Sequence, residues 1–214
     1  MLILSHAAVA ALAYLLGSIP TGFLVGKARG IDIRAVGSGN IGATNALRIL
    51  GKPAGISVLL IDVLKGWTAV VLIPRLLQAL LGAAPDESTF QVQQLIAGFC
   101  AILGHNYTCW LHFKGGKGIA TSAGVLVALV PWALLTILTV WIVLFALTRV
   151  VSVGSIAASA TLPFATWFFY HDWTLTLVTT AMAVLAIYKH RGNIQRLLAG
   201  TEPRVGAKPT EATP

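Results

Sequence analysis

Three polar, glycine-marked segments interrupt an otherwise apolar chain, and they contain the residues best suited to chemistry. The first segment reads GSGNIGATNALR and ends at Arg48. Its glycines would let backbone N–H groups approach an anion, and a short helix predicted from Ala43 to Leu50 would point its positive N-terminus at the same place. Arg48 can hold a phosphate or carboxylate through two hydrogen bonds. The other candidate ligands in this segment are Gly37, Ser38, Gly39, Asn40, Gly42, Thr44 and Asn45.

The first segment also matches the G-x-G-x-x-G pattern of dinucleotide-binding folds. That pattern requires a preceding strand inside a βαβ unit. Its flanks here are apolar helical stretches, so dinucleotide binding is not expected.

The second segment, FKGGKGIAT, begins at Phe113. It lacks the phosphate-binding pattern G-x-x-x-x-G-K-[ST], but lysine is still a good partner for phosphate. Lys117 is flanked by glycines and is the better ligand candidate, whereas Lys114 fits a membrane-anchoring charge. Its candidate binding glycines are Gly115, Gly116 and Gly118.

The third segment, HRGNIQR, places His190 and Asn193 three residues apart, which puts them on one face of a helix. Histidine can act as acid, base or charged donor near neutral pH. Ser155 closes a shorter polar segment that begins at Ser152. The remaining histidines have no comparable partners and are interpreted as structural; they are His6, His105, His112 and His171.

Elements that position these segments must lie in a membrane. Of the 214 residues 57% are hydrophobic and only 10% are charged, against about 25% charged in soluble domains. A spanning helix needs about 20 apolar residues. The sequence therefore predicts an all-α, polytopic bundle of seven transmembrane helices forming a single domain over residues 1–200, with a disordered tail at 201–214. The predicted crossings are Leu2–Val25, Ala54–Leu81, Val92–Trp110, Ile119–Val130, Trp132–Leu147, Ile156–Tyr170 and Thr174–Tyr188.

The basic residues predict the orientation of this bundle. With seven crossings and the N-terminus outside, all of the 15 lysines and arginines except Lys65 and Arg75 fall on the inner side, as cytoplasmic loops require. The C-terminus and all three polar segments are then cytoplasmic. The net charge of +8 is thus explained by orientation and an anion site, without nucleic acid. Asp62 and Lys65 lie inside the second crossing, where an intrahelical ion pair is favoured over a proton or transport path.

Taken together and in this order, the three segments resemble the bacterial acyl-phosphate-dependent glycerol-3-phosphate acyltransferases, an integral membrane family. The resemblance implies seven crossings of the cytoplasmic (inner) membrane, with the active site on the cytoplasmic face. It implies transfer of a fatty acyl group from acyl phosphate to the 1-hydroxyl of sn-glycerol 3-phosphate, which gives lysophosphatidic acid and phosphate. It also implies roles for the glycines of the second segment and for Ser38, Arg48, Lys117, Ser155, His190 and Asn193.

These residues suggest a division of labour. We expect Arg48, Lys117, His190 and Asn193, with Ser155, to bind the phosphate of glycerol 3-phosphate. The Gly37–Asn45 loop, with Ser38, would hold the acyl phosphate and its developing oxyanion. The proton of the attacking hydroxyl would go either to His190 or to a substrate phosphate. No metal, other cofactor or obligate protein partner is expected. The main alternative is a transporter for a phosphorylated solute; a CDP-alcohol phosphatidyltransferase would need an Asp-rich motif that the sequence lacks.

Overall fold

The computed structural model describes residues 2–82 and 86–206, and within these ranges every regular element is a helix. The predicted all-α class is therefore confirmed. The elements are α1 (Leu2–Ser18), α2 (Thr21–Lys27), α3 (Ala43–Leu50), α4 (Lys52–Leu81), α5 (Glu87–Asn106), the 3-10 turn η1 (Cys109–Leu111), α6 (Ile119–Leu129), α7 (Pro131–Thr148), α8 (Val151–Tyr170), α9 (Trp173–Lys189) and α10 (Arg191–Leu198).

Several predicted boundaries are wrong. Helices α5 and α8 begin at Glu87 and Val151, each five residues before the predicted starts at Val92 and Ile156. The first apolar stretch is broken into α1 and α2 around Ile19 and Pro20, because proline lacks an N–H donor and restricts the residue before it. The third stretch ends its α-helix at Asn106, four residues before the predicted end at Trp110. The short helix α3, in contrast, has the predicted bounds.

Among the residues that the structure describes, four helical stretches are long and apolar enough to cross a membrane. These are α1 with α2, α4, α7 and α8, and the apolar helices α6 and α9 are shorter. Large apolar side chains cover their outer surfaces, for example Leu60, Leu138 and Phe168, which are 60%, 44% and 70% exposed. Apolar exposure on this scale fits contact with lipid.

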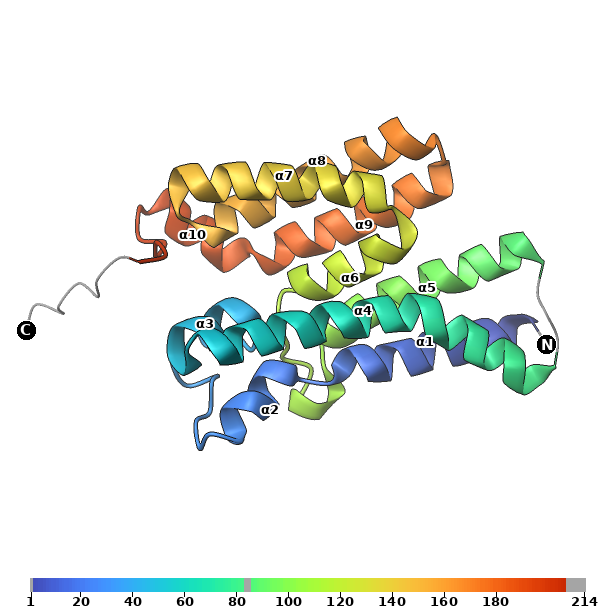
Figure 1. Ribbon diagram of the computed structural model, residues 1–214, viewed down its shortest axis with the longest axis horizontal. Coiled ribbons are helices and arrows are strands. Elements are labelled where there is room, and N and C mark those ends of the chain that lie inside the picture. Colours follow the sequence, from blue (N-terminus) through green and yellow to red (C-terminus); the bar gives the residue numbers. More distant parts are fainter. Residues whose placement is uncertain (1, 83–85, 207–214) are drawn as a thin grey trace, which may run out of the picture.

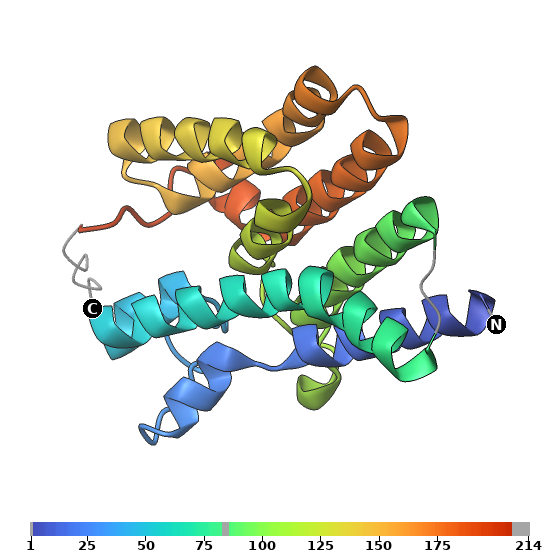
Figure 2. The ribbon, with the colours of Figure 1, turned by 45° about the vertical axis from the view of Figure 1, so that its right-hand side comes forward.

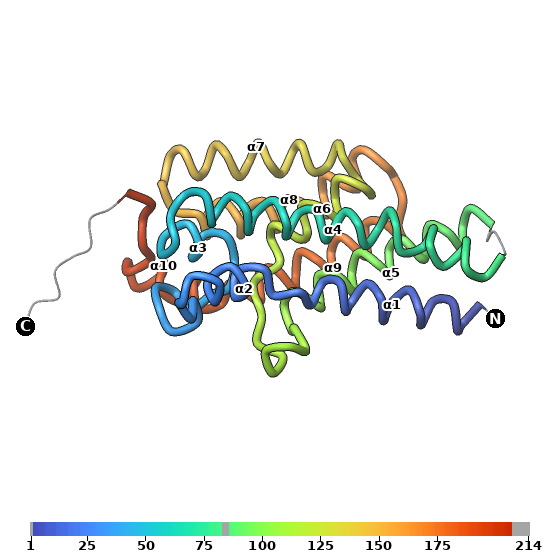
Figure 3. Tube along the Cα trace, turned by 60° about the horizontal axis from the view of Figure 1, so that its bottom comes forward, coloured from blue at the N-terminus to red at the C-terminus, as the bar shows by residue number. Residues whose placement is uncertain are grey.

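The helices form two groups with α6 between them (Figure 1). Helices α1, α4 and α5 make one group, and α7, α8 and α9 make the other (Figure 2). The short helices α2, α3 and α10 gather at one end of the bundle, and the N-terminus lies at the opposite end (Figures 1 and 3). Buried side chains of four helices join the two groups through α6: Val70, Leu126, Leu162 and Met182.

Glycines fix how closely α6 approaches α4. A Cβ at Gly66 would lie 2.2 Å from the carbonyl oxygen of Thr121, and one at Gly124 would lie 1.9 Å from that of Val63. Small residues permit such backbone contact between membrane helices. Because Lys117 stands just before α6, this packing sets where the second polar segment enters the bundle.

Candidate active site

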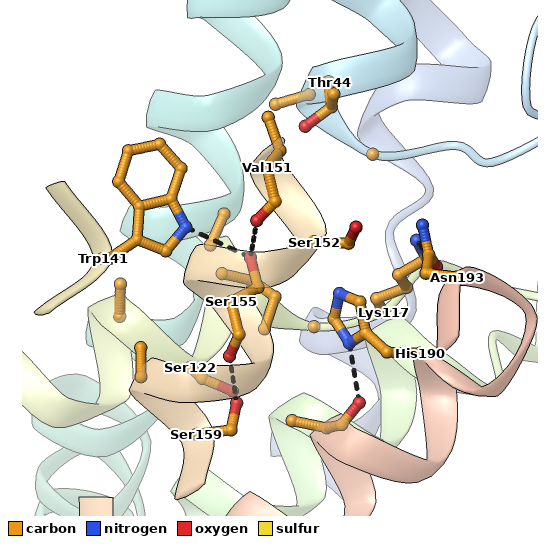
Figure 4. A pocket seen from close by; sticks show the side chains of 18 of the residues that line it. Thr44, Lys117, Ser122, Trp141, Val151, Ser152, Ser155, Ser159, His190 and Asn193 are labelled. Atoms are coloured by element: carbon orange, nitrogen blue, oxygen red, sulfur yellow. Dashed lines mark hydrogen bonds between the residues drawn. The ribbon is translucent and has the colours of Figure 1, made fainter. Parts of the chain in front are cut away.

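The three polar segments, distant in sequence, line one cavity of about 630 Å³ between the two helix groups. Figure 4 shows Lys117, Asn193 and His190 close together, beside Ser152 and Ser155 of α8. Of the predicted catalytic and binding residues, Gly39, Gly115 and Gly116 do not line the cavity. Those that do are Gly37, Ser38, Asn40, Gly42, Thr44, Asn45, Arg48, Lys117, Gly118, Ser155, His190 and Asn193.

The first segment is held in shape by its own asparagines. Asn45 is 2% exposed; its Oδ1 accepts the Ser38 N–H at 3.0 Å, and its Nδ2 donates to the carbonyls of Ile33 and Val36. Asn40 Oδ1 accepts the Gly42 N–H at 2.9 Å. Loop contacts therefore occupy both ends of the Asn45 amide in this structure, and its assignment as a ligand stays a prediction.

Two glycines in this segment likewise allow the loop to adopt its conformation. Gly37 has φ +61°, and a Cβ there would lie 2.3 Å from Asn45 Oδ1. Gly39 has φ +67°, its N–H donates to the Val36 carbonyl at 3.1 Å, and it does not line the cavity. What the segment presents to the cavity is the exposed Ser38, the start of α3 at Thr44, and Arg48 one turn further on. A helix start and a guanidinium both favour an anion.

The second segment rests on the last turn of α5. Gly115 N–H donates to the Asn106 carbonyl at 3.2 Å, and Gly116 N–H donates to the His105 carbonyl at 3.0 Å. A Cβ at Gly115 would lie 2.1 Å from the His105 carbonyl oxygen. Backbone carbonyls therefore occupy both N–H groups in this structure. The glycines are needed so that the loop can lie against α5 and turn Lys117 into the cavity.

Lys117 begins a polar network that runs through Asn193 to Glu202. Its Nζ donates to Asn193 Oδ1, and Asn193 Nδ2 donates to Glu202 Oε1. Ser152 Oγ and Arg196 Nε each donate to Glu202 at 2.7 Å. Burial alone would raise the pKa of Glu202, but these three donors hold it below its usual value. Glu202 therefore remains a carboxylate. It accepts from the amide nitrogen of Asn193 and so orients the amide oxygen of Asn193 toward Lys117.

Glu202 belongs to the segment predicted to be a disordered tail. Up to Gly206 this segment folds back on the bundle, since the Val205 N–H also donates to the Arg149 carbonyl at 2.8 Å. Residues 207–214 lie outside the described part of the chain.

Burial and neighbouring cations change the protonation of the site. Burial, together with the charges of Arg196, Arg48 and Lys189, lowers the pKa of Lys117 to about 8, while the charge of Glu202 opposes this shift. Lys117 thus carries its charge near pH 7 but loses it more easily than an ordinary lysine.

His190 is neutral near pH 7, because burial lowers its pKa to about 4. Its Nδ1 lies 2.8 Å from the Ala186 carbonyl oxygen and must donate to it, so Nε2 carries a lone pair. Figure 4 shows this second nitrogen beside Lys117. His190 can accept a hydrogen bond or a proton here, but it is not the charged donor that was considered in the sequence.

The lowered pKa of Lys117 predicts how activity depends on pH. The parameter kcat/KM reports the ionisation of the protein before substrate binds. It should fall as pH rises through about 8, because Lys117 then loses the charge that attracts phosphate. Replacing Lys117→Arg, whose guanidinium stays charged, should move this fall to higher pH. The comparison of the two profiles removes titration of the substrate itself. A fall at the same pH in both proteins would contradict the assignment.

Ser155 is only partly available to a ligand. Its Oγ donates to the Val151 carbonyl at 3.0 Å and accepts from Trp141 Nε1 at 3.1 Å. Residues not singled out as cavity ligands also line the cavity, including Ser152 and Arg196. Each lies three residues from a predicted site residue, so the helical spacing that paired His190 with Asn193 could have identified them.

The predicted ion pair between Asp62 and Lys65 is confirmed. Lys65 Nζ lies 2.9 Å from Asp62 Oδ1, and both side chains are buried. Lys65 also donates to the Ile19 carbonyl at 2.8 Å, at the break between α1 and α2, while Thr21 Oγ1 donates to Asp62 at 3.0 Å. The pair therefore satisfies a carbonyl freed by the helix break.

The fold and cavity define an integral membrane protein whose cavity combines cationic side chains with apolar walls. A family model described as "Glycerol-3-phosphate acyltransferase" matches residues 7–200. The chain belongs to the glycerol-3-phosphate acyltransferase family.

Relatives support this assignment over nearly the whole chain. A glycerol-3-phosphate acyltransferase of Trichlorobacter lovleyi is 48% identical, over 91% of this chain and 95% of the relative. One of Thermosynechococcus vestitus is 46% identical, over 93% and 94%. The crystal structure of the glycerol 3-phosphate form of PlsY (YgiH), an integral membrane glycerol 3-phosphate acyltransferase, superposes with a TM-score of 0.84 at 36% identity, covering 94% of this chain and 96% of PlsY.

Proposed function

We propose that this acyltransferase moves a fatty acyl group from acyl phosphate to the 1-hydroxyl of sn-glycerol 3-phosphate. The hydroxyl oxygen forms a bond to the acyl carbonyl carbon, the bond from that carbon to the phosphate oxygen breaks, and the hydroxyl proton leaves. The products are lysophosphatidic acid and inorganic phosphate. In support, the similar PlsY has been crystallised in a glycerol 3-phosphate form and in a lysophosphatidic acid form.

One observation carries this proposal: a single cavity has a cationic end and an apolar end. Lys117, Arg48 and Arg196 line the cationic end, which suits two phosphorylated molecules. The apolar end suits an acyl chain and is lined from α6, α7, α8 and α9 by Leu126, Leu134, Ile137, Leu138, Leu162 and Met182.

The residues divide between the two substrates. Arg48, Lys117 and Asn193, with Ser155 and His190 nearby, bind the phosphate of glycerol 3-phosphate. Ser38 and the start of α3 hold the acyl phosphate, where the oxyanion develops. Phosphate is a good leaving group, so positioning and charge stabilisation can supply much of the rate.

The neutral His190 is the protein group best placed to take the hydroxyl proton. Its Nδ1 is fixed on the Ala186 carbonyl, so Nε2 has its lone pair free. A non-bridging oxygen of the substrate phosphate is the alternative acceptor.

Seven crossings complete the proposed topology: α1 with α2, then α4, α5, α6, α7, α8 and α9. The end bearing α3 and α10 faces the cytoplasm, and the N-terminus lies outside the inner membrane. In support, Arg29, Arg48 and Arg196 lie at that end, whereas Glu87 and Asp172 stand at helix starts of the opposite end (Figure 1). The protein needs no obligate protein partner for this reaction.

Reconstitution in liposomes tests this function against transport. With acyl phosphate and radiolabelled glycerol 3-phosphate added outside, we expect labelled lysophosphatidic acid to form without accumulation of free glycerol 3-phosphate in the lumen. Lys117→Ala in the same liposomes is the control for chemistry that does not depend on the cavity. Movement of glycerol 3-phosphate into the lumen without product would refute the proposal and favour a transporter.

A further inference from the structure

Two buried polar residues that line the cavity have no part in the proposed reaction. His105 of α5 and Asp62 of α4 are 5% and 1% exposed, and both line the cavity. Ionisable groups within a membrane bundle are costly and are retained where their contacts matter. What they contact therefore indicates what they do.

His105 contacts the loop that carries Lys117. Its ring fills the space next to Gly116, where a Cβ would lie 2.1 Å from His105 Nε2, 2.9 Å from Cε1 and 3.0 Å from Cδ2. Its carbonyl accepts the Gly116 N–H at 3.0 Å. The ring and the backbone of one residue thus support the position immediately before Lys117.

Asp62 lies on the other side of the ring. His105 Nδ1 is buried without a hydrogen-bond partner, and Asp62 Oδ1 is 3.6 Å away. This is longer than a hydrogen bond, but it places a carboxylate opposite the ring nitrogen. The carboxylate is itself fixed by Thr21 at 3.0 Å and Lys65 at 2.9 Å. The ring is therefore enclosed between an anchored carboxylate and the glycine loop.

We propose that the His105–Asp62 pair positions Lys117. The pair holds Gly116 in place through the His105 ring and carbonyl, so that the Lys117 ammonium stays beside Asn193 in the cavity. The inference rests on the proposed function, because it concerns the same anion site. Neither residue needs to touch substrate; they act through the loop.

A double-mutant cycle distinguishes positioning from general support of the fold. Binding of glycerol 3-phosphate to the purified full chain in detergent is measured by calorimetry for the unchanged protein, His105→Ala, Lys117→Ala and the double variant. Residues that act through one another are strongly non-additive. We expect His105→Ala to weaken binding by about tenfold and to have no further effect once Lys117 is replaced. A second, equal loss in the Lys117→Ala background would overturn the inference.

His6→Ala is the matched control, since His6 lies in α1 away from the cavity and should leave binding unchanged. If His105→Ala does not yield folded protein, His105→Asn, which keeps a donor near the Nδ1 position, takes its place in the cycle. If the unchanged chain binds glycerol 3-phosphate and the His105 variant binds it equally well, this inference alone is overturned. No binding by the unchanged chain would overturn the proposed function as well.

Discussion

Replacing Lys117→Ala should lower kcat/KM for glycerol 3-phosphate by about 100- to 1,000-fold, the usual cost of removing one partner from a desolvated charge contact. Lys117 is the ammonium that reaches into the cavity, where it meets Asn193 and stands among the positive charges of Arg48 and Arg196. With it removed, the anion would lose a charged donor that water cannot easily replace.

Lys114→Ala is the matched control, because Lys114 lies in the same loop but is exposed and does not line the cavity. We expect its kcat/KM to stay within about threefold, since exposed charges contribute little. Both variants should be assayed in membranes that contain equal amounts of protein. Equal losses in the two variants would show that loop charge in general, and not the cavity position of Lys117, matters.

The second large effect should come from His190→Asn, with a fall in kcat of about 100-fold or more, as is usual when a general base is lost. Asparagine can still donate to the Ala186 carbonyl but offers no basic nitrogen, so the variant removes the lone pair of Nε2 and little else. A fall in kcat with a modest change in KM would assign the proton transfer to His190.

The control for this experiment is His171→Asn at the end of α8, where asparagine tolerates the left-handed backbone (φ 48°). Its kcat should be unchanged. If His190→Asn also retains nearly full kcat while KM rises, His190 binds substrate and a substrate phosphate takes the proton.

Much of the fold could be predicted from hydropathy, because a membrane helix must satisfy its backbone internally and therefore appears as an apolar run. The predicted crossings Ile119–Val130 and Trp132–Leu147 leave Pro131 between them, and α7 begins at this proline, a residue that is favoured at a helix start. The break at Pro20 was missed because the residues on both sides of it are apolar and read as one crossing. The end of α5 was misplaced because apolar residues continue into η1.

The location of the site was predictable and its internal contacts were not. Polar segments in a membrane bundle avoid lipid and face the bundle interior or a cavity, so their meeting in one cavity could be expected. Which glycine faces a ligand depends on tertiary neighbours that spacing cannot show. Gly116 is explained by the ring of His105 eleven residues earlier, and the amide of Asn45 is occupied by carbonyls nine and twelve residues earlier.

Comparison of acyl donors by the purified full chain tests the central claim most directly. The protein is supplied with glycerol 3-phosphate and, in separate reactions, the same acyl chain as acyl phosphate, acyl-CoA or acyl carrier protein thioester. We predict lysophosphatidic acid from acyl phosphate alone, with one phosphate released per product and with activity lost in Lys117→Ala. Product formed equally well from a thioester, or formed by the Lys117→Ala variant at the unchanged rate, would contradict the assignment of this cavity to acyl phosphate chemistry.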